Sequence, residues 1–152
     1  MQIIKDNQLC DNAWQFIADD ADLPAGDISV SFNKWQQAET QLLNHEGKLG
    51  VRIGSADAIA SIASDLDKIA LVELDFPDFA DGRLFSSAWL LRSRYGYQGE
   101  IRAIGHFMPD QVFYLSRVGV NAFAPAKADY LPMILANLAD FTVQYQASVN
   151  NA

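Results

Sequence analysis

The chain has 152 residues, of which 50% are hydrophobic and 20% are charged, and its formal net charge at pH 7 is -8. That length suits one domain with its own core and is too short for two ordinary domains. The composition excludes a disordered or fibrous chain, and the acidic balance argues against binding to nucleic acid or to an anionic membrane surface.

Localisation is predicted from what the sequence lacks. No apolar run approaches the length that spans a bilayer, and the first residues lack the apolar core of a signal peptide. Cys10 is the single cysteine, so no internal disulfide can form, which suits the reducing cytoplasm. We therefore expect a cytoplasmic protein without a membrane span.

The first twenty residues predict a β-hairpin appendage. Apolar stretches at 3–4 and 14–17 flank the turn formers Asp6 and Asn7. A polar connector then leads into an α/β core over residues 28–146, and the whole chain, 1–152, is expected to form a single domain.

From residue 28 onward, five short apolar strands alternate with segments of helical spacing. The strands are expected at 28–32, 49–53, 69–74, 101–104 and 122–124. Asn33, Ser55 and Asp129 are the expected N-caps of three of the helices, and Pro109 lies in the first turn of another.

Five strand–helix units in series predict parallel strands with right-handed crossovers. Two architectures satisfy this pattern, a three-layer doubly wound sheet of the flavodoxin-like type and a partial (β/α) barrel. Five units are too few to close an eight-stranded barrel, which favours the flavodoxin-like, mostly parallel five-stranded sheet.

Ligands of open parallel sheets bind outside the carboxyl ends of the strands. This rule selects the segments after the third, fourth and fifth strands, at 75–83, 105–111 and 125–127. The candidate ligand-binding or partner-binding residues are Asp75, Asp78, Asp81, Gly82, Arg83, His106, Asp110, Gln111 and Arg117.

The charges of this region are uneven. Five of the six arginines lie within 83–117, where Glu100 and Asp110 are the only acids. We interpret this as an arginine-rich face for an acidic partner or a small anion, while a structural network of capping acids and paired arginines is the competing interpretation. Exposed aromatic side chains would anchor a partner, and the candidates are Tyr95, Tyr97, Phe107 and Tyr114.

Neither a metal nor a cofactor is predicted. Asp75, Asp78 and Asp81 supply three oxygen ligands, but their spacing is not that of an EF-hand and favours structural acids. His45, His106 and the single thiol are too scattered for a zinc site. The sequence has no G-x-G and no P-loop, so no nucleotide cofactor is expected.

Residues 74–123 carry a distinctive series of motifs. They are F-P-x-F-x-D-G-R at 76–83, L-L-R-x-R-x-G-Y-x-G-E-I-R-A-x-G at 90–105, D-Q at 110–111 and R-x-G-x-x-A-F at 117–123. This series resembles an uncharacterised bacterial family, domain of unknown function 934. The resemblance extends to Ile4–Asp6, Trp14 and Phe141–Gln146, with departures at Leu84-Phe85, where the family often has Gly-Tyr, and at Val120-Asn121, where Phe-Asp is usual.

The resemblance implies a function only through genomic context, since members are often encoded beside sulfite reductase. It implies a cytosolic accessory protein of assimilatory sulfite and sulfate reduction, with sulfite reductase components as expected partners. A small anion as ligand and a homodimer are further expectations. The alternative is a small-molecule enzyme that uses Asp75, Asp81, Arg83, His106 and Asp110, with or without Mg²⁺.

A second resemblance is to response-regulator receiver domains. Leu74 to Gly82 is similar to the run that follows their third strand, one residue shorter. The acidic pair that holds Mg²⁺ is missing because the first strand ends in Ser31-Phe32-Asn33. This resemblance implies a flavodoxin-like sheet and, as another alternative, a receiver-like module that cannot be phosphorylated.

Overall fold

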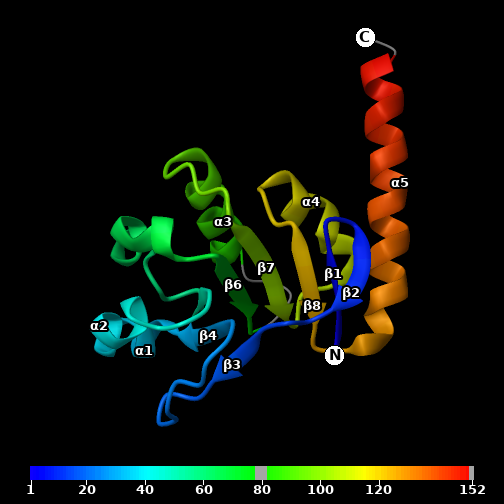
Figure 1. The fold of residues 1–152 in the computed structure, drawn as a ribbon. Coiled ribbons are helices and arrows are strands. Elements are labelled where there is room, and N and C mark those ends of the chain that lie inside the picture. The colour runs from blue at the N-terminus through cyan, green and yellow to red at the C-terminus, as the bar shows by residue number, and fades with distance from the viewer. Residues whose placement is uncertain (78–81, 151–152) are drawn as a thin grey trace.

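One curled eight-stranded sheet organises the chain, and the computed structural model describes residues 1–77 and 82–150, with side chains described through residue 140 (Figure 1). The strands are β1 (Gln2–Lys5), β2 (Gln8–Asp11), β3 (Gln15–Ile17), β4 (Ile28–Ser31), β5 (Leu49–Ile53), β6 (Leu71–Phe76), β7 (Glu100–Gly105) and β8 (Ala122–Pro125). The α-helices are α1 (Phe32–Gln37), α2 (Glu39–Leu43), α3 (Arg83–Ser93), α4 (Val112–Arg117) and α5 (Leu131–Asn150). Short 3₁₀ helices are η1 (Ile59–Ser61), η2 (Ala63–Lys68), η3 (Pro109–Gln111) and η4 (Ala128–Tyr130).

The strand order is β2-β1-β8-β7-β6-β5-β4-β3, and β3 through β8 are parallel. The mixed α/β class is as expected, but the five-stranded flavodoxin-like sheet is not confirmed. A doubly wound sheet requires the strand order to reverse, whereas here consecutive strands are neighbours from β3 to β8. Right-handed crossovers without a reversal place the helices on one face. The alternative of a partial (β/α) barrel fits this arrangement, and the receiver-like resemblance loses its support from the fold.

The two edges of the sheet are joined by a very short linker. β2 ends at Asp11 and β3 begins at Gln15, although these strands lie at opposite edges. Four Cα–Cα steps span at most about 15 Å, whereas the edges of a flat eight-stranded sheet are about 34 Å apart. The sheet must therefore curl toward closure. Asn12 of the linker accepts a hydrogen bond from Arg102 of β7 at 3.0 Å, so the linker crosses the concave face.

The convex face carries the main core. Its strand residues pack against apolar side chains from the helices, such as Trp35, Leu91 and Leu115. Phe76, Phe107 and Phe123 form a chain of aromatic contacts, with ring centroids 6.0 and 5.9 Å apart. The strand residues of this face that are fully buried include Ile4, Val30, Val51, Val72, Leu74, Ile101 and Ala103.

The N-terminal hairpin differs in part from the prediction. Its turn at Asp6 and Asn7 is confirmed, with φ of 51° and 66°, as in the tight turns that suit a two-residue hairpin. The second strand of the hairpin is β2 rather than 14–17, because 15–17 pairs in parallel with β4 as strand β3. The hairpin also extends the main sheet, since β1 pairs with β8.

Two helix predictions need correction. Ser31, and not Asn33, caps α1, because its Oγ accepts the N–H of Lys34 at 3.1 Å. The helix expected from Ser55 is replaced by the short helices η1 and η2. Asp57 accepts the N–H of Gly54 at 2.7 Å, which uses its carboxylate to close a turn after β5.

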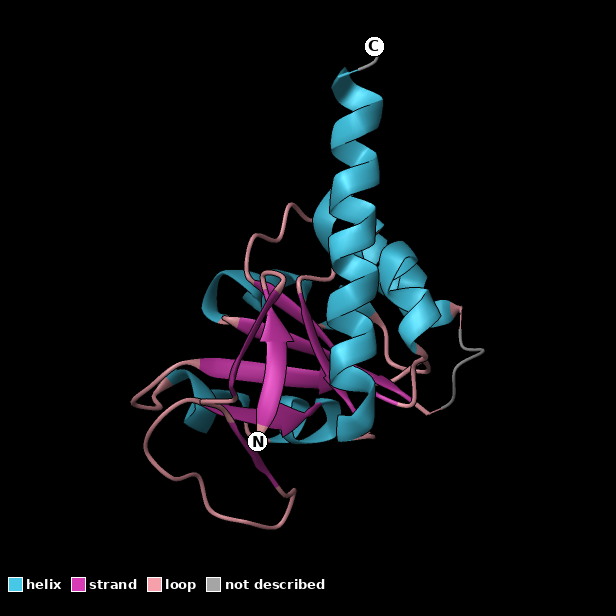
Figure 2. Cartoon of the chain, turned by 90° about the vertical axis from the view of Figure 1, so that its right-hand side faces the viewer, coloured by secondary structure: helices cyan, strands magenta, loops and turns pink. Residues whose placement is uncertain are grey.

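The C-terminal helix α5 runs beside α4 and continues well beyond the sheet (Figures 1 and 2). Leu131, Ile134 and Leu138 of its first half are buried in the core. In the part of the chain that the structure describes, no helix combines the length and apolar character that a membrane crossing needs.

Candidate functional site

The carboxyl ends of β6 and β7 lie side by side, which brings the predicted segments around Asp75 and His106 together. The backbone N–H of His106 donates to the carbonyl of Phe76 at 3.0 Å. Gly105 lies between the two segments with φ of 90°, and a Cβ there would approach Asp75 Oδ1 to 3.0 Å and the Phe76 carbonyl to 2.6 Å. Glycine is therefore required for this close approach.

A pocket of about 260 Å³ opens between the loops that follow β7 and β8, and we call it the carboxyl-end pocket. The backbone N–H of Ala126 donates to the carbonyl of Gly105 at 2.8 Å, which holds the two loops together. Lys127 lies with its Nζ 5.7 Å from the centroid of the Tyr130 ring. The residues that line the pocket are Gly105, His106, Met108, Ala126, Lys127 and Tyr130.

The loop after β7 is held in shape from three sides. The side-chain oxygen of Gln111 accepts the N–H of Met108 at 2.8 Å, and Asn137 of α5 donates to the carbonyl of Pro109 at 2.9 Å. Phe107 is 1% exposed and anchors the loop in the core. Gln111 thus shapes the pocket, and the neighbouring Asp110 is exposed. A preformed pocket needs little ordering when a ligand binds.

The remaining predicted site residues do not all lie near the carboxyl-end pocket. Asp78 and Asp81 lie outside the described residues. Gly82 and Arg83 are exposed at the start of α3. Arg117 ends α4, whose first residue follows Gln111, so the length of the helix separates Arg117 from the pocket.

Comparison with known protein families identifies the family of the chain. The family model described as bacterial protein of unknown function (DUF934) matches residues 50–152. The chain belongs to this family. The matched range holds all but the first residue of β5, the elements from there through α5, and therefore every described residue that lines the carboxyl-end pocket. Searches among curated proteins and among solved structures give no match.

The arginine-rich stretch of this DUF934 protein does not form one face. Arg92 binds the carbonyls of Tyr97, Gly99 and Gly119 through four hydrogen bonds of 2.8–3.0 Å, and burial lowers the pKa of its guanidinium. Arg102 is 2% exposed on the concave face. These two arginines hold the fold, as the competing structural interpretation expects.

The predicted aromatic anchors also divide into buried residues and exposed residues. Tyr97 and Phe107 are buried, Tyr95 is half-buried, and Tyr114 on α4 is 62% exposed. Trp89 on α3 is 54% exposed and was not among the predicted anchors. Its signal in the sequence is that it falls outside the helical spacing of Leu84, Ala88 and Leu91, which form the buried face of α3.

The concave face of the DUF934 protein holds an ionic cluster that sequence reasoning missed. Glu100 lies 2.6 Å from the Arg102 guanidinium and 3.1 Å from the Lys5 ammonium. Arg52 binds Glu73 at 3.3 Å and stacks on the Phe16 ring, with Cζ 3.6 Å from its centroid. The signal was the charged residues within otherwise apolar strands, one in β5 and two at alternate positions in each of β6 and β7.

The described residues hold no group of three or more His, Cys, Asp or Glu side chains placed to bind a metal ion. Of the five residues that the enzyme alternative requires, His106 lines the carboxyl-end pocket. Asp75, Arg83 and Asp110 are not among the described residues that line it, and Asp81 lies outside the described residues. The arrangement offers an imidazole and an ammonium group beside a tyrosine ring. That chemistry suits binding of a small anion.

Proposed function

We propose that this protein is a cytosolic accessory protein of assimilatory sulfite and sulfate reduction that binds a small oxyanion in the carboxyl-end pocket. The observation that carries the proposal is that His106 and Lys127, from different loops, line one pocket of about 260 Å³. The link to sulfur reduction rests on the family resemblance, and the choice of anion rests on that link.

The chemistry of the pocket supports a small ligand. The Lys127 ammonium supplies a full positive charge, and the ring nitrogens of His106 supply hydrogen bonds. Both side chains are exposed, so an anion reaches them without opening the core. Sulfite and sulfate are compact anions that accept several charge-assisted hydrogen bonds, which matches this pair of donors.

Calorimetric titration of the full chain with sulfite, sulfate and chloride at constant ionic strength tests the proposal. We expect binding of sulfite or sulfate but not chloride, and Lys127→Gln is expected to weaken it about tenfold, because a hydrogen bond to a charged group is lost. Lys48→Gln, at the other end of the strands, is the matched control and should bind normally. Absence of binding by the unmodified chain, or equal binding by Lys127→Gln, overturns the proposal.

A second candidate function is docking of a protein partner on the surface formed by α3 and α4. It is favoured by Trp89 and Tyr114, two large aromatic side chains that are more than half exposed on the neighbouring helices of the convex side (Figure 1). Aromatic residues of this kind are enriched among the residues that dominate binding energy in interfaces. Sulfite reductase components are the partners that the family resemblance proposes.

Capture of partners by the tagged protein from cells grown on sulfate tests this second function. We expect the unmodified chain to recover sulfite reductase components and the double variant Trp89→Ser, Tyr114→Ser to lose them. Met133→Ser removes an equally exposed side chain from α5 and is the control. Equal recovery by the double variant and the control contradicts docking at α3 and α4.

A further inference from the structure

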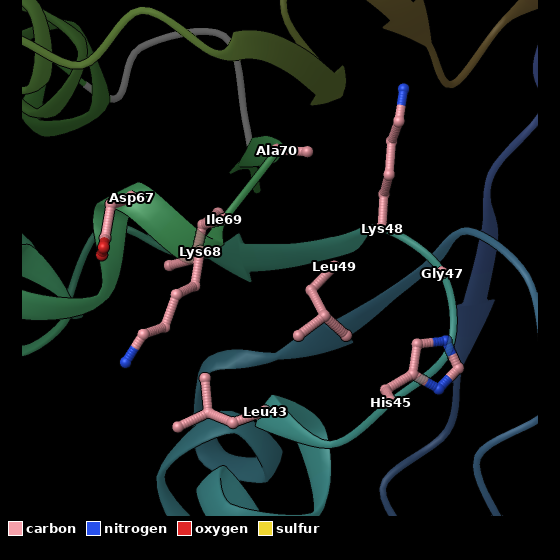
Figure 3. A pocket seen from close by; sticks show the side chains of 9 residues that line it. All are labelled: Leu43, His45, Gly47, Lys48, Leu49, Asp67, Lys68, Ile69 and Ala70. Atoms are coloured by element: carbon pink, nitrogen blue, oxygen red, sulfur yellow. The ribbon is translucent and has the colours of Figure 1, made fainter.

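A second pocket, of about 370 Å³, lies at the amino ends of β5 and β6, and we call it the amino-end pocket (Figure 3). Residues that precede these strands line it, together with Leu49 at the start of β5 and Leu43 from the end of α2. It lies at the opposite end of the parallel strands from the carboxyl-end pocket. Its volume falls within the range of about 300–1,000 Å³ that small-molecule sites occupy.

One wall of the amino-end pocket is fixed by a dense set of hydrogen bonds. His45 Nε2 lies 2.7 Å from the carbonyl of Gly26, and the N–H of Lys48 donates to Asp27 at 3.0 Å. Gly47 has φ of 124°, and a Cβ there would lie 2.2 Å from the Gly26 carbonyl, so this close approach requires glycine. The wall is thus shaped before any ligand binds.

The floor of the pocket is apolar. Leu49 and Ile69 are 6% and 3% exposed, and Leu43 covers the side with 38% of its surface open to solvent. Burial of an apolar group against these side chains removes it from water, which is the main driving force for binding of small organic molecules.

The rim of the pocket is positively charged although the protein is acidic. Lys48 and Lys68 are exposed, and neither forms an ion pair within 4.0 Å with any residue that the structure describes. Figure 3 shows their ammonium groups on opposite sides of Leu49. Asp67 is the acid among the lining residues, and its carboxylate points away from Lys48.

We propose that the amino-end pocket binds an organic anion with an apolar body, such as a straight-chain carboxylate. The hydrocarbon part lies on Leu43, Leu49 and Ile69, and the carboxylate meets a lysine of the rim. The long, flexible stem of lysine lets the ammonium group swing to the anion. A compact inorganic anion would leave the apolar floor of the amino-end pocket uncovered.

The two histidines give each pocket its own reporter, because His45 lines the amino-end pocket and His106 lines the other. We would follow their ring signals by NMR while the full chain is titrated with butyrate, hexanoate and octanoate, and assign them with His45→Gln and His106→Gln. The His45 signals are expected to move with an affinity that rises by up to about fourfold per methylene. Hexan-1-ol and hexylamine, which lack the negative charge, are expected to bind more weakly.

Matched variants decide whether the lysines and the floor act as described. Lys48→Gln and Lys68→Gln are each expected to weaken hexanoate binding by up to about fivefold, because the rim charges are exposed. Leu43→Ser is expected to remove the dependence on chain length, while Lys127→Gln leaves hexanoate binding unchanged. The proposal is overturned if the His45 signals do not respond, if hexan-1-ol binds as well as hexanoate, or if both lysine variants bind normally. A sulfite titration on the same sample, read at His106, tests the proposed function separately.

Discussion

The two faces of the curled sheet are built from the same strands but hold different chemistry. On the convex face, neighbouring strands present Val51, Val72 and Ile101 to the helices. One residue further along each strand, the side chains point to the concave side, where Arg52, Glu73 and Arg102 form a row of neighbours. Both rows are largely removed from solvent, since Glu73 and Arg102 are 4% and 2% exposed.

The difference follows from what covers each face. Helices bring apolar side chains to the convex face, so its residues are stabilised by burial. The concave face is covered by its own curl and by the linker of Asn12, and beside its charged groups it holds a small apolar cluster of Ile3, Ile104 and Ala124. Its charged groups are therefore satisfied by one another, as Glu100 is by Arg102 and Lys5. Burial of apolar side chains on the convex face is favourable by itself, whereas burial of charged groups on the concave face requires that each charge has a partner.

Removal of Arg102 is the strongest test of this comparison. Arg102→Ala leaves the Glu100 carboxylate buried with Lys5 as its remaining ionic partner, and we expect the free energy of unfolding to fall by about 3–5 kcal/mol. Urea unfolding followed by circular dichroism measures it. The double variant Glu100→Gln, Arg102→Met removes both charges and is expected to cost less than Arg102→Ala alone. A single variant that costs less than about 1 kcal/mol would show that the concave cluster is open to water.

Tyr97 tests the convex side, where its buried hydroxyl is hydrogen-bonded to a backbone carbonyl. Its hydroxyl donates to the carbonyl of Ile69 at 2.8 Å, and Tyr97→Phe is expected to lower the free energy of unfolding by about 1.5 kcal/mol. Urea unfolding at neutral pH measures this loss. An unchanged stability would mean that water replaces the hydroxyl at Ile69.

The same residue gives a pH dependence with a definite sign. Burial raises the pKa of the Tyr97 hydroxyl above its ordinary value of about 10. The folded protein therefore keeps a proton that the unfolded chain releases above pH ~10, so the free energy of unfolding falls as pH rises past this value. Unfolding curves measured between neutral pH and pH ~11 should show a shallower fall for Tyr97→Phe than for the unmodified chain. An equal slope for both would assign the alkaline loss to other groups.

The strands could be predicted from the sequence, but their arrangement could not. Apolar runs located β4 through β8 to within two residues, because parallel strands buried on both faces appear as nearly continuous apolar runs. The order of the strands depends on contacts between distant segments. In particular, residues 15–17 look like a hairpin strand and pair instead with β4 at the far edge. No local pattern distinguishes these two pairings.

The candidate site was predictable to the extent that topology alone determines it. Asp75 and His106 meet because parallel strands end at one edge, and that rule needs no side-chain detail. The roles of the arginines were not predictable, since Arg92 and Arg102 are distinguished from exposed arginines only by the carbonyls and carboxylates around them. The ligand-binding roles of Asp75, Arg83 and His106 stay predictions.

Ser29 gives the smallest and most specific test of the contrast between the faces. Its side chain is 0% exposed on the concave face, and Ser29 lies two residues before Ser31, the residue of β4 that pairs with Arg52. The Oγ of Ser29 has no hydrogen-bond partner among the described residues. A buried hydroxyl without a partner loses its hydrogen bonds to water on folding, so Ser29→Ala is expected to raise the free energy of unfolding by about 1 kcal/mol. Ser31→Ala is the control, because that hydroxyl caps α1 and its loss is expected to destabilise by a similar amount. A loss of stability for Ser29→Ala as large as that for Ser31→Ala would contradict this expectation. It would mean that water reaches the hydroxyl of Ser29 on the concave face. The ion pairs of that face would then be hydrated rather than satisfied only by one another.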